Sequence, residues 1–76
     1  MNYKVAKTML LIMGKPIRHF SMWENAHICM KNGRPTMINT LGSSIPIADM
    51  DNYYKPTINS NAKYEEGWEV YVEANG

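Results

Sequence analysis

The dipeptide Asn32-Gly33 is the feature that most restricts how this chain can fold. It joins two runs of strand-forming residues, 26–31 and 34–38, and both of its residues tolerate the positive φ angles of a type I′ turn. We therefore expect the two runs to pair as an antiparallel hairpin. Pro35 removes one backbone donor, which predicts that the second strand lies at an edge or is irregular near its start.

A short amphipathic helix is predicted near the N-terminus, from about Tyr3 to Met13. Asn2 is a favourable N-cap, because its side-chain oxygen can accept from the first free N–H groups. Apolar residues then recur at three- and four-residue spacing along one face. Gly14 is suited to end the helix, and Pro16 prevents it from resuming.

The remaining segments are short and extended, and turns separate them. We expect an extended segment at 15–20 with Ile17 facing the core, followed by a turn at 21–25. A loop is expected at 39–46, and the stretch 45–51, with its turn-forming aspartates, is ambiguous. A short strand interrupted by Pro56 at 53–58, a turn at 59–61 and a half-buried strand at 68–72 complete the chain. Residues 74–76 are expected to fray. Together these elements predict one α+β domain over 1–76, in which a short N-terminal helix packs on a small, mostly antiparallel sheet of four or five strands.

The length of 76 residues limits the size of the core. Cys29 is the only cysteine, so an internal disulfide cannot supplement that core, which leaves a metal ion or self-association as the supplement. A lone thiol also suits a reducing compartment. The longest apolar run, 8–13, is too short to cross a bilayer, and no signal-peptide cleavage site follows it. We expect a cytoplasmic protein that does not enter membranes.

The net charge of +1 is small. A protein that grips duplex nucleic acid usually carries a larger basic excess, so we expect no duplex partner. The chain is rich in tyrosine and tryptophan, with five and two copies. Both side chains combine an apolar face with a polar group, which suits interfaces and planar ligands.

Metal and catalytic sites are not favoured by the sequence. His27 and Cys29 share one strand face, but a zinc site needs three or four ligands, and His19 lies across a turn. Cys29 is not accompanied by the elements of a nucleophilic site. The run 49–52 resembles the start of a calcium loop but has neither its glycine nor its final glutamate, so it predicts a turn. We expect no catalytic residues, no bound metal and no cofactor.

Aromatic and cationic residues favour a binding function instead. Planar side chains stack on bases, and arginine and lysine neutralise phosphates. The glycine- and serine-rich run 42–44 could also donate to a phosphate, although a flexible loop is the simpler interpretation. For each aromatic residue, core packing is the competing explanation. The candidates of these kinds are Arg18, Trp23, Ser43, Tyr53, Tyr54, Lys55 and Trp68.

Several segments follow a pattern in order along the chain. They are 1–3 with Ala6 and Leu10, Gly14-Lys15-Pro16-Ile17-Arg18, Trp23 in a turn, the extended 26–30, Tyr54-Lys55-Pro56-Thr57-Ile58 and Gly67-Trp68. In this order the chain resembles the small Thoeris anti-defence domains of the second type. The stretch from Arg18 to Trp23 is longer than in that family, and the chain ends soon after Trp68.

The resemblance implies a bacteriophage sponge, which sequesters a cyclic nucleotide or cyclic ADP-ribose-type immune signal without cleaving it. Binding would take place between subunits of a homo-oligomer, a dimer or a tetramer, and would block activation of a bacterial defence effector. Arg18 and Lys55 would then meet phosphates. The aromatic candidates Trp23, Tyr53, Tyr54 and Trp68 would stack, and Ser43 or Asn59 would supply hydrogen bonds.

Two other functions are open from the sequence. One is a small protein-binding inhibitor of a host defence enzyme or nuclease, because methionine-rich surfaces and free strand edges suit protein partners. The other, less favoured, is an enzyme or metalloprotein centred on His27 and Cys29.

Overall fold

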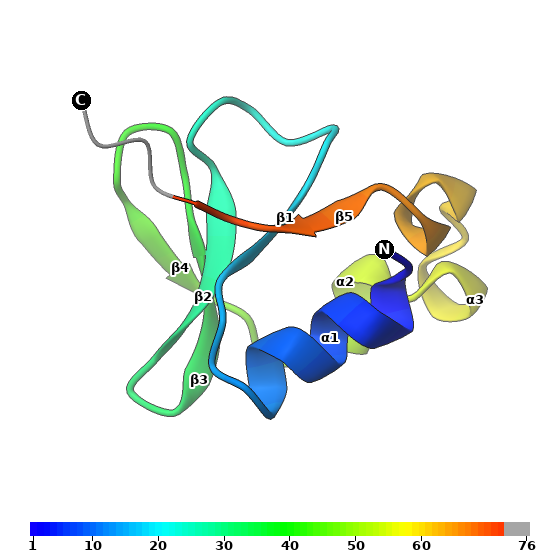
Figure 1. Ribbon diagram of the computed structural model, residues 1–76, viewed down its shortest axis with the longest axis horizontal. Helices are drawn as coiled ribbons and strands as arrows, with labels where there is room; N and C mark the ends of the chain where they lie inside the picture. The colour runs from blue at the N-terminus through cyan, green and yellow to red at the C-terminus, as the bar shows by residue number, and fades with distance from the viewer. Residues whose placement is uncertain (73–76) are drawn as a thin grey trace.

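The computed structural model describes residues 1–72, which form a five-stranded antiparallel sheet and several helices (Figure 1). This confirms the predicted α+β arrangement of an N-terminal helix packed on a small sheet. In chain order the elements are α1 (Tyr3–Leu11), β1 (Ile17–His19), β2 (His27–Lys31), β3 (Arg34–Ile38), β4 (Ser44–Pro46), α2 (Met50–Tyr54), α3 (Pro56–Asn59), the 3₁₀ helix η1 (Ala62–Glu65) and β5 (Trp68–Val70).

The strands lie in the order β4-β3-β2-β1-β5, so the last strand pairs with the first. Figure 1 shows β5 beside β1, with the N-terminus close to the start of β5. The terminal ammonium of Met1 donates to the Trp68 carbonyl at 2.8 Å, and the Trp68 N–H donates to the Met1 carbonyl at 3.1 Å. These contacts join the two ends of the described chain.

The helix α1 begins as predicted and ends two residues early. The Asn2 side chain accepts from the Val5 N–H at 2.8 Å and confirms the N-cap. The helix ends at Leu11, and the chain then turns through Gly14 at φ +67°. Glycine adopts this left-handed backbone without a Cβ clash, which lets β1 begin three residues later.

The predicted hairpin is present, with Asn32 at φ +54° and Gly33 at φ +74°. Of the two alternatives predicted from Pro35, the edge strand is wrong, because β3 lies between β2 and β4. The Pro35 carbonyl faces β4 and accepts from the Ile47 N–H at 2.9 Å. Strand pairing with β4 extends only to Thr36, so no hydrogen bond of the sheet requires the backbone N–H that Pro35 lacks.

The prediction of a loop at 39–46 is wrong for its last three residues, which form β4. The Asn39 side chain accepts from the N–H groups of Leu41 and Ser43, at 3.0 and 2.9 Å. Gly42 adopts φ +86° within the same turn. This compact reversal returns the chain against β3, which is why a polar, turn-like segment ends in a strand.

The predicted strand at 53–58 is also wrong, because this stretch lies in the two short helices α2 and α3. Asp49 caps α2 by accepting from the Asp51 N–H at 3.0 Å. Pro56 opens α3, a position where its missing N–H costs nothing. Ser60 follows at φ +64° and ends α3 within the expected turn.

The first connection and the last strand largely follow the sequence pattern. The extended segment at 15–20 contains β1, and 21–25 forms a connection without helix or strand. The strand pattern at 68–72 is confirmed for Trp68–Val70, whereas Val72 lies beyond the strand and is exposed. The predicted fraying of 74–76 lies outside the described residues.

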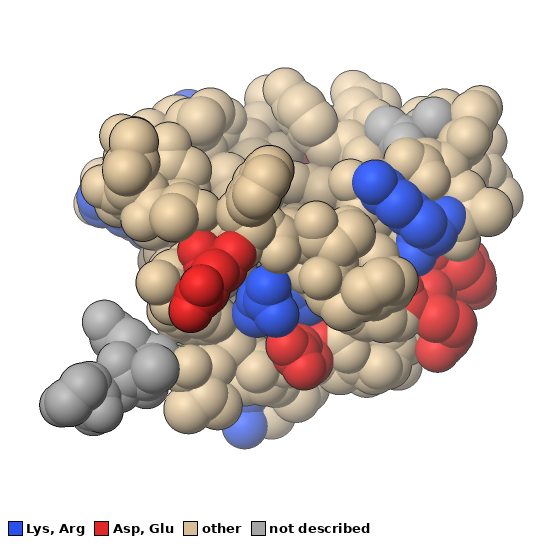
Figure 2. Space-filling view, turned by 90° about the horizontal axis from the view of Figure 1, so that it is seen from above, with Lys and Arg blue, Asp and Glu red and all other residues tan. Residues whose placement is uncertain are grey.

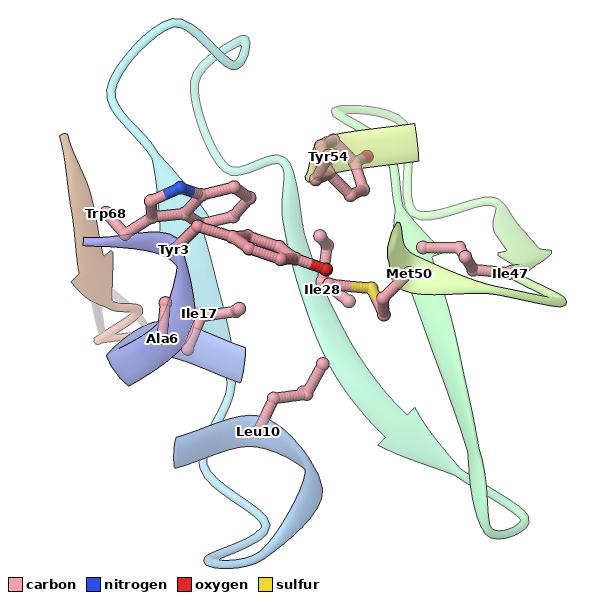
Figure 3. Close-up of a cluster of buried hydrophobic side chains, with 9 residues drawn as sticks. All are labelled: Tyr3, Ala6, Leu10, Ile17, Ile28, Ile47, Met50, Tyr54 and Trp68. Carbon is pink, nitrogen blue, oxygen red and sulfur yellow. The ribbon is translucent and has the colours of Figure 1, made fainter. Parts of the chain in front are cut away.

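The core lies between one face of the sheet and the helices α1 and α2 (Figure 3). Its buried members are Tyr3, Ala6, Leu10, Ile17, Ile28, Ile47, Met50, Tyr54 and Trp68. Aromatic rings form one side of this cluster: the centroids of Tyr3 and Trp68 lie 5.8 Å apart, and those of Tyr54 and Trp68 lie 5.4 Å apart, edge to face. Across residues 1–72, no helix is long and apolar enough to cross a membrane.

Candidate functional site

The sheet has a second face, opposite the core, and most of the polar strand residues lie on it. Side chains alternate along each strand, so Ile17 and His19 point to the core while Arg18 belongs to the other side. The strand registers extend this alternation across the sheet. We call this side the outer face; its residues are Arg18, His27, Cys29, Lys31, Arg34, Thr36, Ile38, Ser44, Pro46 and Glu69.

A hollow of about 560 Å³ lies at the β1–β5 side of the outer face. We call it the Arg18 hollow. The Arg18 guanidinium donates to the Glu69 carboxylate at 2.9 Å and to two backbone carbonyls, of Met22 at 3.1 Å and Ala26 at 3.4 Å. A guanidinium has about five N–H donors, so these bonds leave donors for a ligand. The lining residues are Arg18, Met22, Glu24, Asn25, Glu69, Val70, Tyr71 and Val72.

Tyr71 also lines this hollow and was not among the candidates selected by residue type. Its ring stacks on the His27 imidazole with centroids 3.9 Å apart and an interplanar angle of 5°. His27 Nδ1 lies 2.9 Å from the Asn25 carbonyl oxygen. The alternation at 68–72 could have indicated this residue, because it places Tyr71 on the side away from Trp68.

Trp23 lies in the segment between β1 and β2, whose residues Met22 and Glu24 line the Arg18 hollow. Its side chain is 83% exposed, the highest value of any aromatic residue in the described chain. The Thr40 hydroxyl donates to the Glu24 carbonyl at 3.0 Å and joins this segment to the neighbouring loop at 39–43. Figure 1 shows both loops at the same end of the sheet, so the structure brings Arg18, Trp23 and the Ser43 loop to one end.

Lys55 and Tyr53 lie elsewhere, beside the helices. Lys55 lines a separate hollow of about 370 Å³ together with Tyr3, Lys4, Lys7 and Asp51. Tyr53 belongs to α2 and is exposed. Asn59 is the last residue of α3, and its side chain lies outside the described part of the structure. The predicted ligand residues therefore do not converge on a single hollow.

The hollow beside Lys55 contains a carboxylate, that of Asp51, which accepts two side-chain hydrogen bonds. Asp51 Oδ1 accepts from Lys7 Nζ at 2.9 Å and from the Tyr3 hydroxyl at 2.7 Å. The bond from Lys7 has the larger effect, and together with the bond from Tyr3 it holds the pKa of Asp51 below its usual value. Burial, followed by the bond to Asp51, raises the pKa of the Tyr3 hydroxyl above its ordinary range.

Tyr54 and Trp68 are core residues. Trp68 is 2% exposed, and its indole N–H donates to the Tyr64 carbonyl at 2.7 Å. Burial raises the pKa of Tyr54 to about 12. Because protein atoms cover both rings, stacking on a ligand there would require the core to open.

The residues considered for a metal site are separated by the sheet. His19 is fully buried on the core side, and its Nε2 lies 2.7 Å from the carbonyl oxygens of both Lys63 and Glu66. His27 and Cys29 belong to the outer face. Among residues 1–72, no three His, Cys, Asp or Glu side chains lie close enough to hold a metal ion.

On the side of the molecule that lies at the top of Figure 1, the charged side chains form small groups of both signs, separated by neutral residues (Figure 2). No protein-family model matches the chain, and neither curated proteins nor solved structures gave a match.

Proposed function

We propose that this protein is a non-enzymatic phage anti-defence sponge that binds a cyclic nucleotide or cyclic ADP-ribose-type immune signal. The observation that carries the proposal is the Arg18 hollow, which places a guanidinium beside the loop that presents Trp23. The resemblance to Thoeris anti-defence domains supports the same function. Acting in the cytoplasm of an infected bacterium, the protein would keep the signal from its defence effector.

The hollow suits such a ligand in size and chemistry. Its volume of about 560 Å³ falls within the usual range for small-molecule sites. Arg18 supplies a fork of donors that matches phosphate oxygens. Its partner Glu69 has a side chain that is 58% exposed, so the carboxylate can turn into water when a phosphate takes its place. Glu24 and Asn25 offer acceptors and donors to ribose hydroxyls or base edges.

Trp23 supplies the stacking surface in this proposal. An exposed indole can cover the face of a base, an interaction of about 1–3 kcal/mol. Self-association would complete the site: a second copy placed over this end of the sheet would remove both Trp23 and the ligand from water. We propose a homo-oligomer, a dimer or a tetramer, for this reason. Tight binding alone is sufficient for the function, and no bond of the ligand needs to break.

Isothermal titration calorimetry against cyclic dinucleotides and cyclic ADP-ribose isomers tests the proposal. We expect micromolar or tighter binding of at least one compound. Trp23→Ala and Arg18→Gln should each weaken that binding about tenfold or more. Ile12→Ala is the matched control, because Ile12 is exposed at the far end of α1. Absence of binding by folded wild-type protein, or equal affinity in wild type and Trp23→Ala, would contradict the proposal.

A protein-binding inhibitor of a host defence enzyme or nuclease is the second candidate. The observation that favours it is the exposure of Leu41, at 90%, in the loop bonded to the Trp23 segment. Two exposed apolar side chains on neighbouring loops are suited to a protein partner. A stoichiometric complex with one such enzyme, lost in both Leu41→Ala and Trp23→Ala, would support this function. A nucleotide released by heating protein purified from signalling cells would support the sponge instead.

A further inference from the structure

The tip of the β2–β3 hairpin carries two positive charges in direct opposition. Lys31 and Arg34 flank the Asn32-Gly33 turn and are paired across the two strands. Like charges at such positions destabilise a sheet. Within residues 1–72, neither side chain forms an ion pair with a carboxylate. No carboxylate of residues 1–72 therefore offsets the repulsion between these two cations, and a bound anion would relieve it.

A hollow of about 350 Å³ lies beside this pair, and its lining is cationic or neutral throughout. We call it the hairpin hollow. Its residues are Lys31, Asn32, Arg34, Thr36, Ser44 and Pro46, all from the turn or from the outer face of β2, β3 and β4. It differs in this respect from the Arg18 hollow, where Glu24 and Glu69 contribute negative charge.

The hydrogen bonds within the hairpin hollow leave donors available to a ligand. Lys31 Nζ donates to the Ser44 hydroxyl oxygen at 3.2 Å, so the Ser44 proton stays available. The Thr36 hydroxyl donates to the Arg34 carbonyl at 3.1 Å and braces the backbone that carries the guanidinium. An ammonium, a guanidinium, a hydroxyl and an amide side chain together match a group with several acceptor oxygens and negative charge.

We propose that the hairpin hollow is an anion site that takes the phosphoryl group of a small metabolite. Arg34 and Lys31 neutralise its charge, and Ser44 and Asn32 donate to its remaining oxygens. The site lies at the opposite end of the outer face from the Arg18 hollow, because β2 runs from His27 at one end to Lys31 at the other. It shares no residue with that hollow and does not depend on the function proposed for it.

The test is an NMR titration of the ¹⁵N-labelled protein with inorganic phosphate, against chloride at matched ionic strength. We expect saturable shifts of the amides from 31 to 34 and of Ser44, and an affinity about tenfold or more weaker in Lys31→Gln/Arg34→Gln. Lys4→Gln/Lys15→Gln is the control, since it removes the same charge from exposed positions outside this hollow and should bind as wild type. Shifts that do not saturate, or equal binding by the two double variants, would overturn the proposal.

A comparison of adenosine 5′-monophosphate with adenosine identifies the group that is recognised. The monophosphate should shift the same amides and adenosine should not; equal shifts with both would overturn the assignment to a phosphoryl group. The outcome is independent of the Arg18 hollow. Trp23→Ala should leave phosphate binding at Lys31 and Arg34 unchanged, even if no cyclic signal binds at all.

Discussion

The hydroxyl of Tyr3 and the carboxylate of Asp51 lie 2.7 Å apart and join α1 to α2. Lys7, one turn further along α1, donates to the same carboxylate oxygen at 2.9 Å. The short helix α2 depends on such contacts, because a helix of this length is not stable alone. Asp51 therefore helps to hold α2 where Met50 and Tyr54 can enter the core.

Replacing Asp51 should destabilise the protein in a pH-dependent way. We expect Asp51→Asn to lower the free energy of unfolding by about 1–2 kcal/mol near neutral pH. The pKa of this carboxyl is depressed in the folded state. Its stabilisation is therefore present above the unfolded pKa, near 4, and is lost as pH falls through the folded value. Urea unfolding at several pH values measures this effect.

The control for that experiment is Asp49→Asn, which keeps a good N-cap at the start of α2. It should change the free energy of unfolding far less than Asp51→Asn does. The difference between wild type and Asp51→Asn should shrink below about pH 4. A difference that stays constant through this range would show that the negative charge of Asp51 contributes nothing measurable to stability.

The two tryptophans should respond oppositely to substitution. Trp68 is enclosed by aromatic rings and donates to Tyr64, so Trp68→Ala should cost about 3–5 kcal/mol or prevent folding. Trp23→Ala should change stability by no more than about 0.5 kcal/mol. Thermal unfolding measures both effects. Iodide quenching of the fluorescence of the ligand-free monomer gives a second measure: Trp23 emission should be quenched and Trp68 emission protected. A destabilised Trp23→Ala monomer would contradict the described exposure.

Two glycines with similar backbone angles allow the cost of a left-handed backbone to be distinguished from the cost of a steric clash. Gly42 and Gly67 adopt φ +86° and +92°, and a Cβ at Gly42 meets open space. A Cβ at Gly67 would overlap the Phe20 ring and lie 3.0 Å from Nε2 of buried His19. We expect Gly42→Ala to cost about 1–2 kcal/mol and Gly67→Ala at least about 1 kcal/mol more. Chemical denaturation compares them; equal losses would mean that the Phe20 ring moves aside freely.

Alkaline pH should destabilise the fold through its buried tyrosines. Burial raises the pKa of Tyr54 to about 12, so the folded state favours the neutral phenol. Its contribution is complete below the unfolded pKa of about 10 and is lost as pH rises from there through about 12. Tyr54→Phe should reduce the loss of stability between about pH 9 and 11 without abolishing it, because the pKa of Tyr3 is raised as well. Identical pH profiles for wild type and Tyr54→Phe would contradict this prediction.

Local chemistry was sufficient to predict several elements. Asn2 caps α1, Asn32-Gly33 forms the hairpin turn, and the alternation that starts at Trp68 marks β5. Each of these depends on neighbouring residues, through backbone sterics or hydrogen bonds across a few positions. The predictions failed for β4, α2 and α3, where turn-forming residues are organised by capping and by packing against distant elements.

Some residues of the candidate site could be predicted from the sequence. Arg18 and Trp23 could be selected by residue type, and the structure places them at one end of the outer face. Lys31 and Arg34 were not selected, because their shared hollow exists only when β4 brings Ser44 beside them. Residue type alone also could not distinguish exposed Trp23 from buried Trp68.

The amino-acid sequence was sufficient to predict the α+β class, the N-terminal helix and the central hairpin. Their signals are caps, positive-φ turn residues and apolar periodicity, which act over a few residues. Three features became clear from the packed fold alone: β5 returns to pair with β1, β4 pairs with the other edge of the hairpin, and some aromatic rings are buried while others are exposed. Those features depend on contacts between residues far apart in the chain, whose free energy arises only after the elements pack together.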